Sequence, residues 1–563
     1  MKKLLTLLLS VLLLASCTTT NKVVIDENKD YTLPVYYHYE PDEFYKKCDE
    51  LKGYIETNDK KKAFELYDEM YKEALSVLDL TAVCYIDYCE DVNNEYYIDE
   101  QQYIETVFDE LNNKFLTLCH SMTESSFAND FKKHINNEDM YSDYVEYVEK
   151  SQEELDLLAR ENELIQKSNE IRDKTDDYTY TYEGKEYTSD EIYDIEDDEL
   201  YAKLIEGLDG KINADLGEIY VELVGIRDKI AKLNGYDNYA LYADSEMYYR
   251  DYTEEDLRKF KDVVKSHGSD IIYYIYNGPS YIKTDVEEDK LIEDTMSILT
   301  TISPYINTAH NIFENNNLYS ITRGDGRYKG SYEYSMTTGS AFVFINLGKK
   351  SYDYFTLAHE FGHFTNAITV NNPSPLTREG CYDVFEIHST GLEMLFGNKA
   401  QDIFKENYDD QMMADILEAL DSVLVGCIYD EFQRRVYENP NMSLDEINQT
   451  FKDVMFEYGW DAYDGYPSIQ YEWMYVPHNF DSPMYYVSYG TSAFAALQIW
   501  AKSRSNFDEA VKVWENILVA PAYNDGYMKI VSDAGLSPFS NPDSTEEVLK
   551  TIFDYFEENT AEE

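Results

Sequence analysis

Two histidines, His359 and His363, lie four residues apart in a His-Glu-Phe-Gly-His segment, and Glu360 follows the first. Residues 352–368 have helical periodicity, so both imidazoles lie on one helix face and can reach a single cation. Zn²⁺ suits this pair because it accepts imidazole nitrogen at about 2.0–2.1 Å in tetrahedral geometry. Glu360 lies about 100° round the helix from His359, close enough to act on water at the metal without being a ligand. The spacing predicts one zinc ion per chain, with Glu360 as the catalytic base of a peptidase.

A catalytic zinc site needs a third protein ligand and one open position. The downstream candidates are Glu379, Asp383, Glu386, His388 and Glu393. Residues 386–395 read as a helix, on which Glu386 and Glu393 share a face at a spacing of seven. His388 lies about 200° round that helix from Glu386, so the two cannot easily both point at one metal. Helix geometry alone leaves the third ligand open.

The elements that must position these residues are mainly helical. Residues 42–170 and most of the chain after residue 200 show helical spacing of apolar and aromatic side chains. Residues 178–188 alternate about a Glu-Gly-Lys turn and predict a hairpin. Residues 340–347 are apolar and β-branched or aromatic, and we expect an edge-like strand there that can pair with an extended peptide. We expect an N-terminal helical domain with a small hairpin at 31–199 and a catalytic domain at 200–563.

The composition excludes some classes of partner. Lys+Arg is 48 and Asp+Glu is 110, so the formal net charge is 48 − 110 = −62. Such a surface repels nucleic acid and anionic lipid and attracts cationic substrates, so we expect no nucleic-acid partner. A hydrophobic content of 44% excludes a wholly disordered acidic chain.

The first residues predict export. Lys2 and Lys3 precede a short apolar run, which is typical of a signal peptide and too short to span a bilayer. Residues 14–17, Leu-Ala-Ser-Cys, resemble a bacterial lipobox, so we expect a signal peptide at 1–16, a lipid-attached Cys17 and a flexible tether at 17–30. Two acyl chains on Cys17 would anchor the protein stably to a membrane on its extracytoplasmic side. Six other cysteines form no obvious framework, and we expect most of them to be buried thiols.

The His-Glu-x-Gly-His segment and the later Glu386-Ile-His-Ser-Thr-Gly-Leu-Glu393 resemble the oligoendopeptidase F and thimet oligopeptidase family of zinc metallopeptidases. The resemblance runs from about residue 151 to residue 501. Its other segments are 178–188, 223–227, 235–239, 250–253, 355–358, 476–478 and 485–491. It implies a mostly α, zincin-type fold with a small β-sheet beside the active-site helix. It also implies a deep substrate channel that admits short peptides and excludes folded proteins.

The resemblance also implies roles for particular residues. It makes Glu386 the third zinc ligand, and it places Glu393 where a carboxylate steadies a histidine ligand. A histidine and a tyrosine of the family stabilise the transition state, which points to His478 with Tyr489, and to Tyr486 as second choice. A phenol fits this role because it donates a hydrogen bond at neutral pH.

The sequence therefore predicts a zinc-dependent endopeptidase that hydrolyses short peptides outside the cytoplasmic membrane. Three alternatives remain: a zinc peptidase with another third ligand, a lipoprotein that binds peptides without cleaving them, and a structural surface protein with an accidental motif. Glu360 favours turnover over binding alone, because a binding protein has no need of a base.

Overall fold

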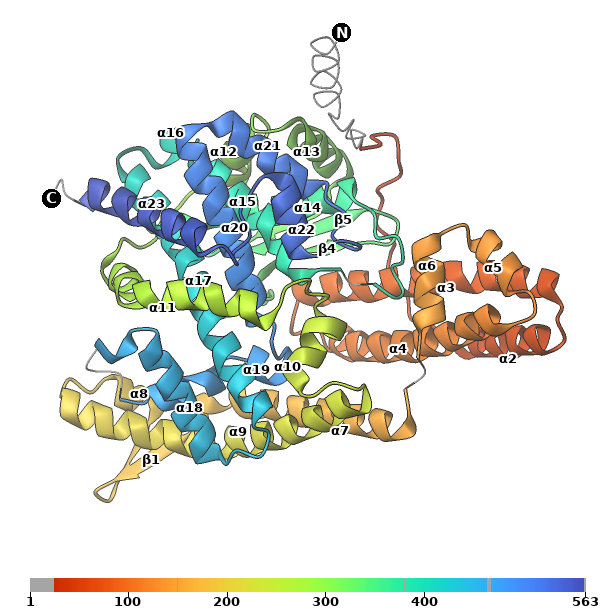
Figure 1. Cartoon of the computed structure of the whole chain (residues 1–563). Helices are drawn as coiled ribbons and strands as arrows, with labels where there is room; N and C mark the ends of the chain where they lie inside the picture. Colours follow the sequence, from red (N-terminus) through yellow and green to blue (C-terminus); the bar gives the residue numbers. More distant parts are fainter. Residues whose placement is uncertain (1–24, 149, 379, 463–466, 561–563) are drawn as a thin grey trace, which may run out of the picture.

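The computed structural model describes residues 25–148, 150–378, 380–462 and 467–560. The expected signal peptide, Cys17 and Glu379 lie outside these residues. The described chain is mostly helical with two small sheets, which confirms the fold class expected from the sequence (Figure 1). None of the described helices combines the length and the apolar character needed to cross a bilayer. The six cysteines beyond Cys17 are all buried free thiols, as expected.

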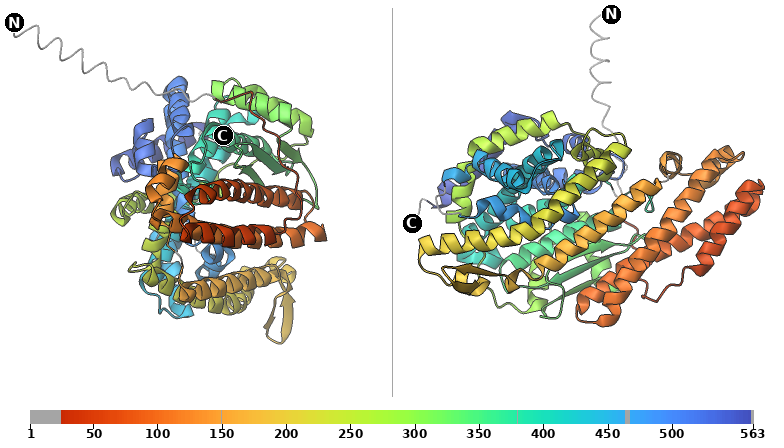
Figure 2. Two further views of the ribbon diagram at one scale, coloured as in Figure 1. Left: turned by 90° about the vertical axis from the view of Figure 1, so that its right-hand side faces the viewer. Right: turned by 90° about the horizontal axis from the view of Figure 1, so that it is seen from below.

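The N-terminal helices form a unit that projects from one side of the molecule (Figures 1 and 2). They have their own hydrophobic cluster, which contains Phe44, Met70 and Phe115. Phe342 and Phe344 also belong to this cluster, so the unit packs against the three-stranded sheet. The helices are α2 (Asp42–Glu56), α3 (Lys60–Glu90), α4 (Glu95–Glu124), α5 (Ala128–Ile135) and α6 (Glu138–Glu146).

A second, larger cluster contains Ile25 and Tyr31 and then most of the buried apolar residues from Leu164 onward. The hairpin expected at 178–188 is present, with Tyr180 paired to Tyr187 across antiparallel strands β1 (Thr179–Tyr182) and β2 (Lys185–Thr188). The division between clusters lies well before residue 199, where we expected a domain boundary, and that boundary stays a prediction. The helices up to the sheet are α7 (Gln152–Arg172), η1 (Thr175–Asp177), α8 (Ser189–Tyr193), α9 (Asp198–Leu233), α10 (Tyr239–Tyr242), η2 (Ala243–Met247), α11 (Glu254–Asn277), α12 (Glu288–Leu299) and α13 (Pro304–Asn316).

The strand expected at 340–347 is present, but the expectation that it is an edge strand was wrong. The sheet has the order β3-β5-β4, in which β5 (Ala341–Asn346) is central, parallel to β3 (Tyr319–Thr322) and antiparallel to β4 (Ser331–Ser335). Val343 and Phe344 of β5 belong to different hydrophobic clusters, so both of its faces are covered. A strand buried on both faces reads as one continuous apolar run. The outer strands of this sheet are therefore β3 and β4, and polar side chains alternate along β4.

Four helices that pack in succession position the site: α14 (Tyr352–Thr369) on α15 (Tyr382–Gly397), α15 on α20 (Tyr486–Ser505), and α20 on α17 (Tyr408–Glu438). Gly426 and Gly490 meet where α17 crosses α20: a Cβ on Gly426 would lie 3.0 Å from the Gly490 backbone. The other helices are α16 (Gln401–Phe404), η3 (Lys405–Asn407), α18 (Leu444–Glu457), η4 (Trp460–Ala462), η5 (Ile469–Tyr475), α19 (His478–Asp481), α21 (Phe507–Leu518), α22 (Tyr527–Ala534) and α23 (Pro542–Thr560).

Candidate active site

Helix α14 starts directly after the central strand and is held there by one carboxylate. The side chain of Asp353 accepts hydrogen bonds from the backbone N–H groups of Gly348 (2.8 Å) and Lys349 (3.0 Å). A carboxylate near a helix N-terminus also stabilises the helix dipole. The loop and the first turn of α14 are thus tied together, which sets the position of His359 two turns later.

Gly362, inside the motif, lets α15 approach α14 closely. A Cβ at this position would lie 2.7 Å from the Cα of Ser389 and 2.8 Å from the carbonyl oxygen of His388. Both contacts are with backbone atoms, which cannot rotate away as a flexible side chain could. The close approach brings Glu386 of α15 over the histidine face of α14.

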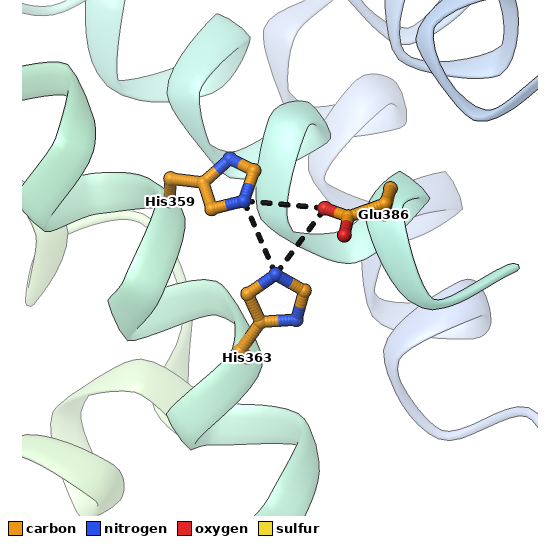
Figure 3. Close-up of side chains that lie close together, drawn as sticks. All are labelled: His359, His363 and Glu386. Atoms are coloured by element: carbon orange, nitrogen blue, oxygen red, sulfur yellow. Dashed lines mark hydrogen bonds and ion pairs between the residues drawn. The ribbon is translucent and has the colours of Figure 1, made fainter. Parts of the chain in front are cut away.

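His359, His363 and Glu386 point toward one another (Figure 3). The two Nε2 atoms are 3.1 Å apart, and Glu386 Oε2 lies 3.2 Å from His359 Nε2 and 3.3 Å from His363 Nε2. In a tetrahedral zinc site with bonds of about 2.0–2.1 Å, ligand atoms lie about 3.3 Å from each other. The three donor atoms therefore fit a zinc ion, with the fourth position left for water or substrate.

The other candidates for a third ligand lie elsewhere. His388 Nε2 is 3.2 Å from His363 Nδ1, the nitrogen on the far side of that ring from the cluster. Asp383 is fully buried, with its carboxylate 3.5 Å from the guanidinium of Arg250. Among the described residues, Glu386 is the carboxylate that completes the cluster with the two histidines.

Hydrogen bonds from neighbouring side chains orient the cluster. Glu393 Oε1 lies 2.6 Å from His359 Nδ1, where a sequence resemblance led us to expect a supporting carboxylate. The Ser389 hydroxyl donates a hydrogen bond of 3.0 Å to the Glu386 carboxylate. An imidazole that donates through Nδ1 keeps the Nε2 lone pair free for a metal.

Glu360 is 6% exposed and lies beside the cluster at the wall of the cavity. Burial raises the pKa of Glu360, while the nearby imidazoles act in the opposite direction. A carboxylate with a raised pKa is a better proton acceptor near neutral pH than an exposed one. Glu360 is thus placed to exchange protons with a molecule in the cavity.

The cluster opens into a cavity of about 440 Å³ formed by β4, α14, α15, α17 and α20. Tyr489 lines this cavity, and burial, with Glu386 close by, raises its pKa to about 12. Tyr486 instead packs in a tilted arrangement against Tyr429 of α17, with ring centroids 5.0 Å apart, and it is not among the lining residues. The structure therefore favours Tyr489 over Tyr486 as the phenol that faces a bound molecule.

His478 lies behind the tyrosines rather than at the cavity wall. Its ring stacks on Tyr485 with centroids 5.7 Å apart and lies 6.0 Å from that of Tyr489. Burial lowers the pKa of His478, and its buried Nδ1 has no hydrogen-bond partner among the described residues. A neutral imidazole in this place can orient Tyr485 and Tyr489.

Four residues near the site were not singled out in the sequence: Tyr485, Glu333, Asp415 and Glu418. Tyr485 lies near Glu386, which contributes to the raised pKa of Tyr485 after burial. Glu333 lies on β4, and Asp415 and Glu418 lie on α17; all three line the cavity. One sequence signal existed for Asp415: it is a charged residue among the apolar side chains of a helix face, next to Ile416.

A helix with His-Glu-x-x-His, an edge strand at the same cavity and a carboxylate from the next helix are together typical of a metallopeptidase site. Residues 306–515 match the profile of peptidase family M3. These residues contain both histidines, Glu360, Glu386, His478 and Tyr489. The chain therefore carries a peptidase family M3 domain, which confirms the family resemblance drawn from the sequence.

Comparisons with individual proteins agree with this domain. "Oligoendopeptidase F, plasmid" of Lactococcus lactis subsp. cremoris and "Oligoendopeptidase F homolog" of L. lactis subsp. lactis (strain IL1403) are each 26% identical to this chain over 251 residues. The match spans 42% of this chain and only 39% of the length of either relative.

Solved structures extend the likeness of fold to nearly the whole chain. PZ peptidase A with inhibitor 2 superposes with a TM-score of 0.70 at 20% identity, covering 94% of this chain and 99% of the other. Oligoendopeptidase-F from Enterococcus faecium gives a TM-score of 0.57 at 15% identity, covering 92% and 99%. The mostly helical fold outside residues 306–515 is thus shared as well.

Proposed function

We propose that the protein is a zinc-dependent endopeptidase that hydrolyses short peptides. The observation that carries the proposal is the set of three donor atoms 3.1–3.3 Å apart, with Glu360 beside them at the wall of one cavity. The M3 domain supports the reaction class, and the spacing and types of the donors support zinc as the metal.

His359, His363 and Glu386 would hold the metal through two Nε2 atoms and one carboxylate oxygen. When bound, Zn²⁺ supplies Lewis acidity that activates water and polarises the peptide carbonyl. Glu393 accepts a hydrogen bond from Nδ1–H of His359 and keeps that imidazole in the tautomer and orientation that a ligand requires.

Glu360 takes a proton from the attacking water and passes it to the leaving amine. Tyr489 donates a hydrogen bond to the carbonyl oxygen as negative charge develops on it. A pKa of about 12 keeps this phenol protonated across the neutral range, so it remains a donor throughout. His478 and Tyr485 position Tyr489 through ring contacts.

The edge strand β4 and the size of the cavity support a peptide substrate. An extended peptide can add to a free strand edge by backbone hydrogen bonds, with Glu333 of β4 already facing the cavity. A cavity of about 440 Å³ accommodates a short stretch of peptide rather than a folded domain. We therefore assign short peptides as the substrate class.

Residues 1–17 support a place on the outer side of a bacterial cytoplasmic membrane, anchored through lipid on Cys17. Expression of the full chain with and without Cys17→Ala tests this placement. Wild-type protein is expected in the membrane fraction with a lipid-modified N-terminus by mass spectrometry, and the variant is expected to be released. An unmodified wild-type N-terminus would contradict the anchor and leave the peptidase proposal intact.

The central experiment is incubation of the purified protein with a mixed peptide library, read by mass spectrometry, with and without a zinc chelator. Cleavage is expected to stop on chelation and to return with zinc. The matched control is Glu360→Gln, which should bind one zinc per chain and cleave nothing. Undiminished cleavage by metal-free protein, or near-normal turnover by the variant, would overturn the proposal.

A further inference from the structure

The part of the cavity that α17 contributes is acidic. Asp415 and Glu418 are three residues apart on this helix and therefore project from the same face. Both line the cavity, but at different depths: Asp415 is 2% exposed, whereas Glu418 is exposed. A group that enters from solvent would thus meet Glu418 first and Asp415 after it.

Asp415 lacks the partners that a buried carboxylate needs. Its Oδ1 accepts a hydrogen bond of 3.3 Å from the hydroxyl of Tyr281, while its buried Oδ2 has no hydrogen-bond partner among the described residues. A buried carboxylate oxygen without a donor is strongly unfavourable. The neighbouring charges do not help, because Glu393 and Glu418 are both acidic. One acceptor at the cavity wall therefore remains open to a donor from outside.

Among the described residues, no lysine or arginine reaches this place. The described residues that line the cavity include six carboxyl side chains and no Lys or Arg. The six are Glu333, Glu360, Glu386, Glu393, Asp415 and Glu418. A metal ion would bind Glu386, and the imidazole of His359 is hydrogen-bonded to Glu393. The pair on α17 is left without a positive partner.

Aromatic rings complete this part of the wall. Tyr352 lines the cavity, and its ring centroid is 5.0 Å from that of Tyr281, whose hydroxyl contacts Asp415. Ring faces attract cations, and carboxylates add charge-assisted hydrogen bonds. Ammonium and guanidinium groups match both features, whereas a neutral amide or an acidic side chain matches neither.

From this geometry we propose that Asp415 and Glu418 form a specificity subsite that binds a cationic group of the peptide substrate. The proposal rests on the proposed peptidase function. Glu393 touches His359 on one side and lies near Asp415 on the other, so the subsite adjoins the metal cluster. The bound cation therefore belongs to a residue near the bond that is cleaved. It is either a Lys or Arg side chain or the N-terminal ammonium of the peptide.

Matched peptides test the subsite. One series places either lysine or norleucine at each position around one cleavable bond. The two side chains have similar aliphatic stems and differ in the ammonium group that only lysine carries. A second series compares free with acetylated N-termini. Wild-type kcat/KM is expected to be about ten- to a hundredfold higher for the cationic member of one series, which corresponds to the coupling of a close charge pair. The series that responds identifies the source of the cation.

Variants connect the preference to α17. Asp415→Asn and Glu418→Gln are each expected to reduce the cationic preference about tenfold, chiefly through KM, while cleavage of the neutral peptide persists. Because Glu418 is exposed, its variant should fold even if Asp415→Asn does not. The control Glu438→Gln removes the same charge from the exposed end of α17 and should leave the preference unchanged.

The outcomes separate the subsite from the peptidase function. Equal kcat/KM for the charged and neutral members of both series would overturn the subsite and leave the peptidase intact. If wild-type protein cleaves no peptide, the peptidase function fails, and the subsite is then judged by fluorescence anisotropy with the same labelled peptides on zinc-loaded protein. About tenfold tighter binding of the cationic peptide would still support it, and equal affinities would overturn it.

Discussion

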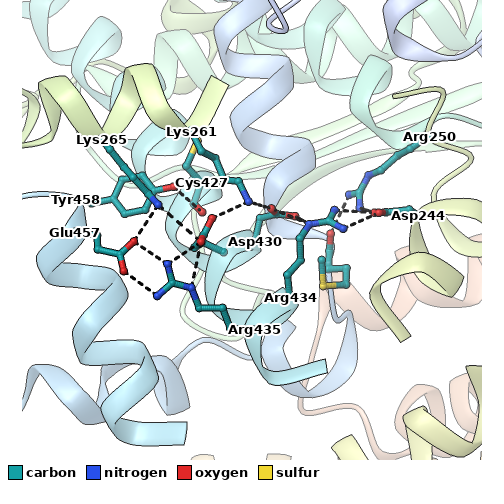
Figure 4. A network of polar contacts seen from close by, with 12 residues as sticks. Asp244, Arg250, Lys261, Lys265, Cys427, Asp430, Arg434, Arg435, Glu457 and Tyr458 are labelled. Carbon is teal, nitrogen blue, oxygen red and sulfur yellow. Dashed lines mark hydrogen bonds and ion pairs between the residues drawn. The ribbon is translucent and has the colours of Figure 1, made fainter. Parts of the chain in front are cut away.

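Helix α17 carries two pairs of acidic side chains about four turns apart, and their surroundings differ. Asp415 and Glu418 face the cavity, where the lining residues include no Lys or Arg. Asp430 lies in a network of ion pairs with neighbouring helices (Figure 4), and Glu431 pairs with the same lysine, Lys261. The same helix thus holds one acidic pair that other parts of the chain neutralise and one that they do not.

In the network, each carboxylate has a positive partner at close range. Lys261 of α11 lies 2.9 Å from Asp430 and 2.8 Å from Glu431, and Arg434 donates to Asp430 at 3.0 Å. Arg434 also reaches Asp244, which in turn pairs with Arg250 (Figure 4). Burial acts to raise the pKa of Asp430, but Arg434 and Lys261 outweigh it and lower that pKa.

The network also supports the active site from a distance. Arg250 donates hydrogen bonds to the carbonyl oxygen of Met484 (2.8 Å) and to the hydroxyl of Ser488 (2.9 Å). Ser488 precedes Tyr489 on α20, so the ion pairs tie α11 and α17 to the helix that presents the phenol. The paired charges of the network hold helices together, whereas the unpaired acidic pair at the cavity is where we propose that a ligand binds.

The largest expected effect is on catalytic activity, at the metal cluster in the cavity. Glu386→Ala removes a proposed metal ligand, so kcat/KM for a peptide should fall at least about a thousandfold, or about 4 kcal/mol of transition-state stabilisation. Zinc content should fall with it, and the urea midpoint of the metal-free protein should change little. An active variant with full zinc occupancy would show that another residue is the third ligand.

In the ion-pair network around Asp430, the expected effect is on stability. Lys261→Met leaves Asp430 and Glu431 with one cation fewer in a buried place, so the free energy of unfolding should decrease by about 3 kcal/mol. Urea titration measures the loss, and the folded fraction should still cleave peptides. Lys259→Met, at a more exposed position of α11, is the control and should stay within about 0.5 kcal/mol of wild type.

The network should also respond to acid. Burial acts to raise the pKa of Glu431, but Lys261 and Arg435 outweigh it and lower that pKa to about 2 from an ordinary value of 4.5. A carboxylate with a lowered folded pKa stabilises the protein above its unfolded pKa, and this contribution is lost as pH falls toward the folded value. The free energy of unfolding of wild type should therefore exceed that of Glu431→Gln by about 2 kcal/mol at pH 6, and this difference should shrink below pH 4.5. A difference independent of pH would exclude this charge effect.

The smallest expected effect is on stability, and it separates the two acidic pairs of α17. Asp415→Asn removes a buried carboxyl group that lacks a positive partner, so the free energy of unfolding should stay the same or rise by up to about 1 kcal/mol. The matched substitution Asp430→Asn removes a paired charge and should lower it. Equal losses in both variants would mean that the two acidic pairs do not differ as their surroundings indicate.

The sequence by itself determined the parts of the site that depend on local geometry. The spacing of His359 and His363 places both rings on one face of any α-helix, and Glu360 follows from the same helical repeat. The family resemblance added Glu386 and Glu393, and both lie where it implied. The helical fold class and the hairpin near residue 180 were likewise predictable, because the periodicity of side chains is a local property.

Tertiary structure decided the rest, because contacts between distant segments are not encoded by local spacing. The sheet order made β5 central and β4 one of the two edge strands, although β5 has the stronger strand pattern. Because of the way α20 crosses α17, Tyr489 lines the cavity and Tyr486 does not. Asp415 and Asp430 are both acidic residues on a mostly apolar helix, and only the packing of α11 beside one of them supplied a lysine partner. Which charge was neutralised therefore depended on the fold.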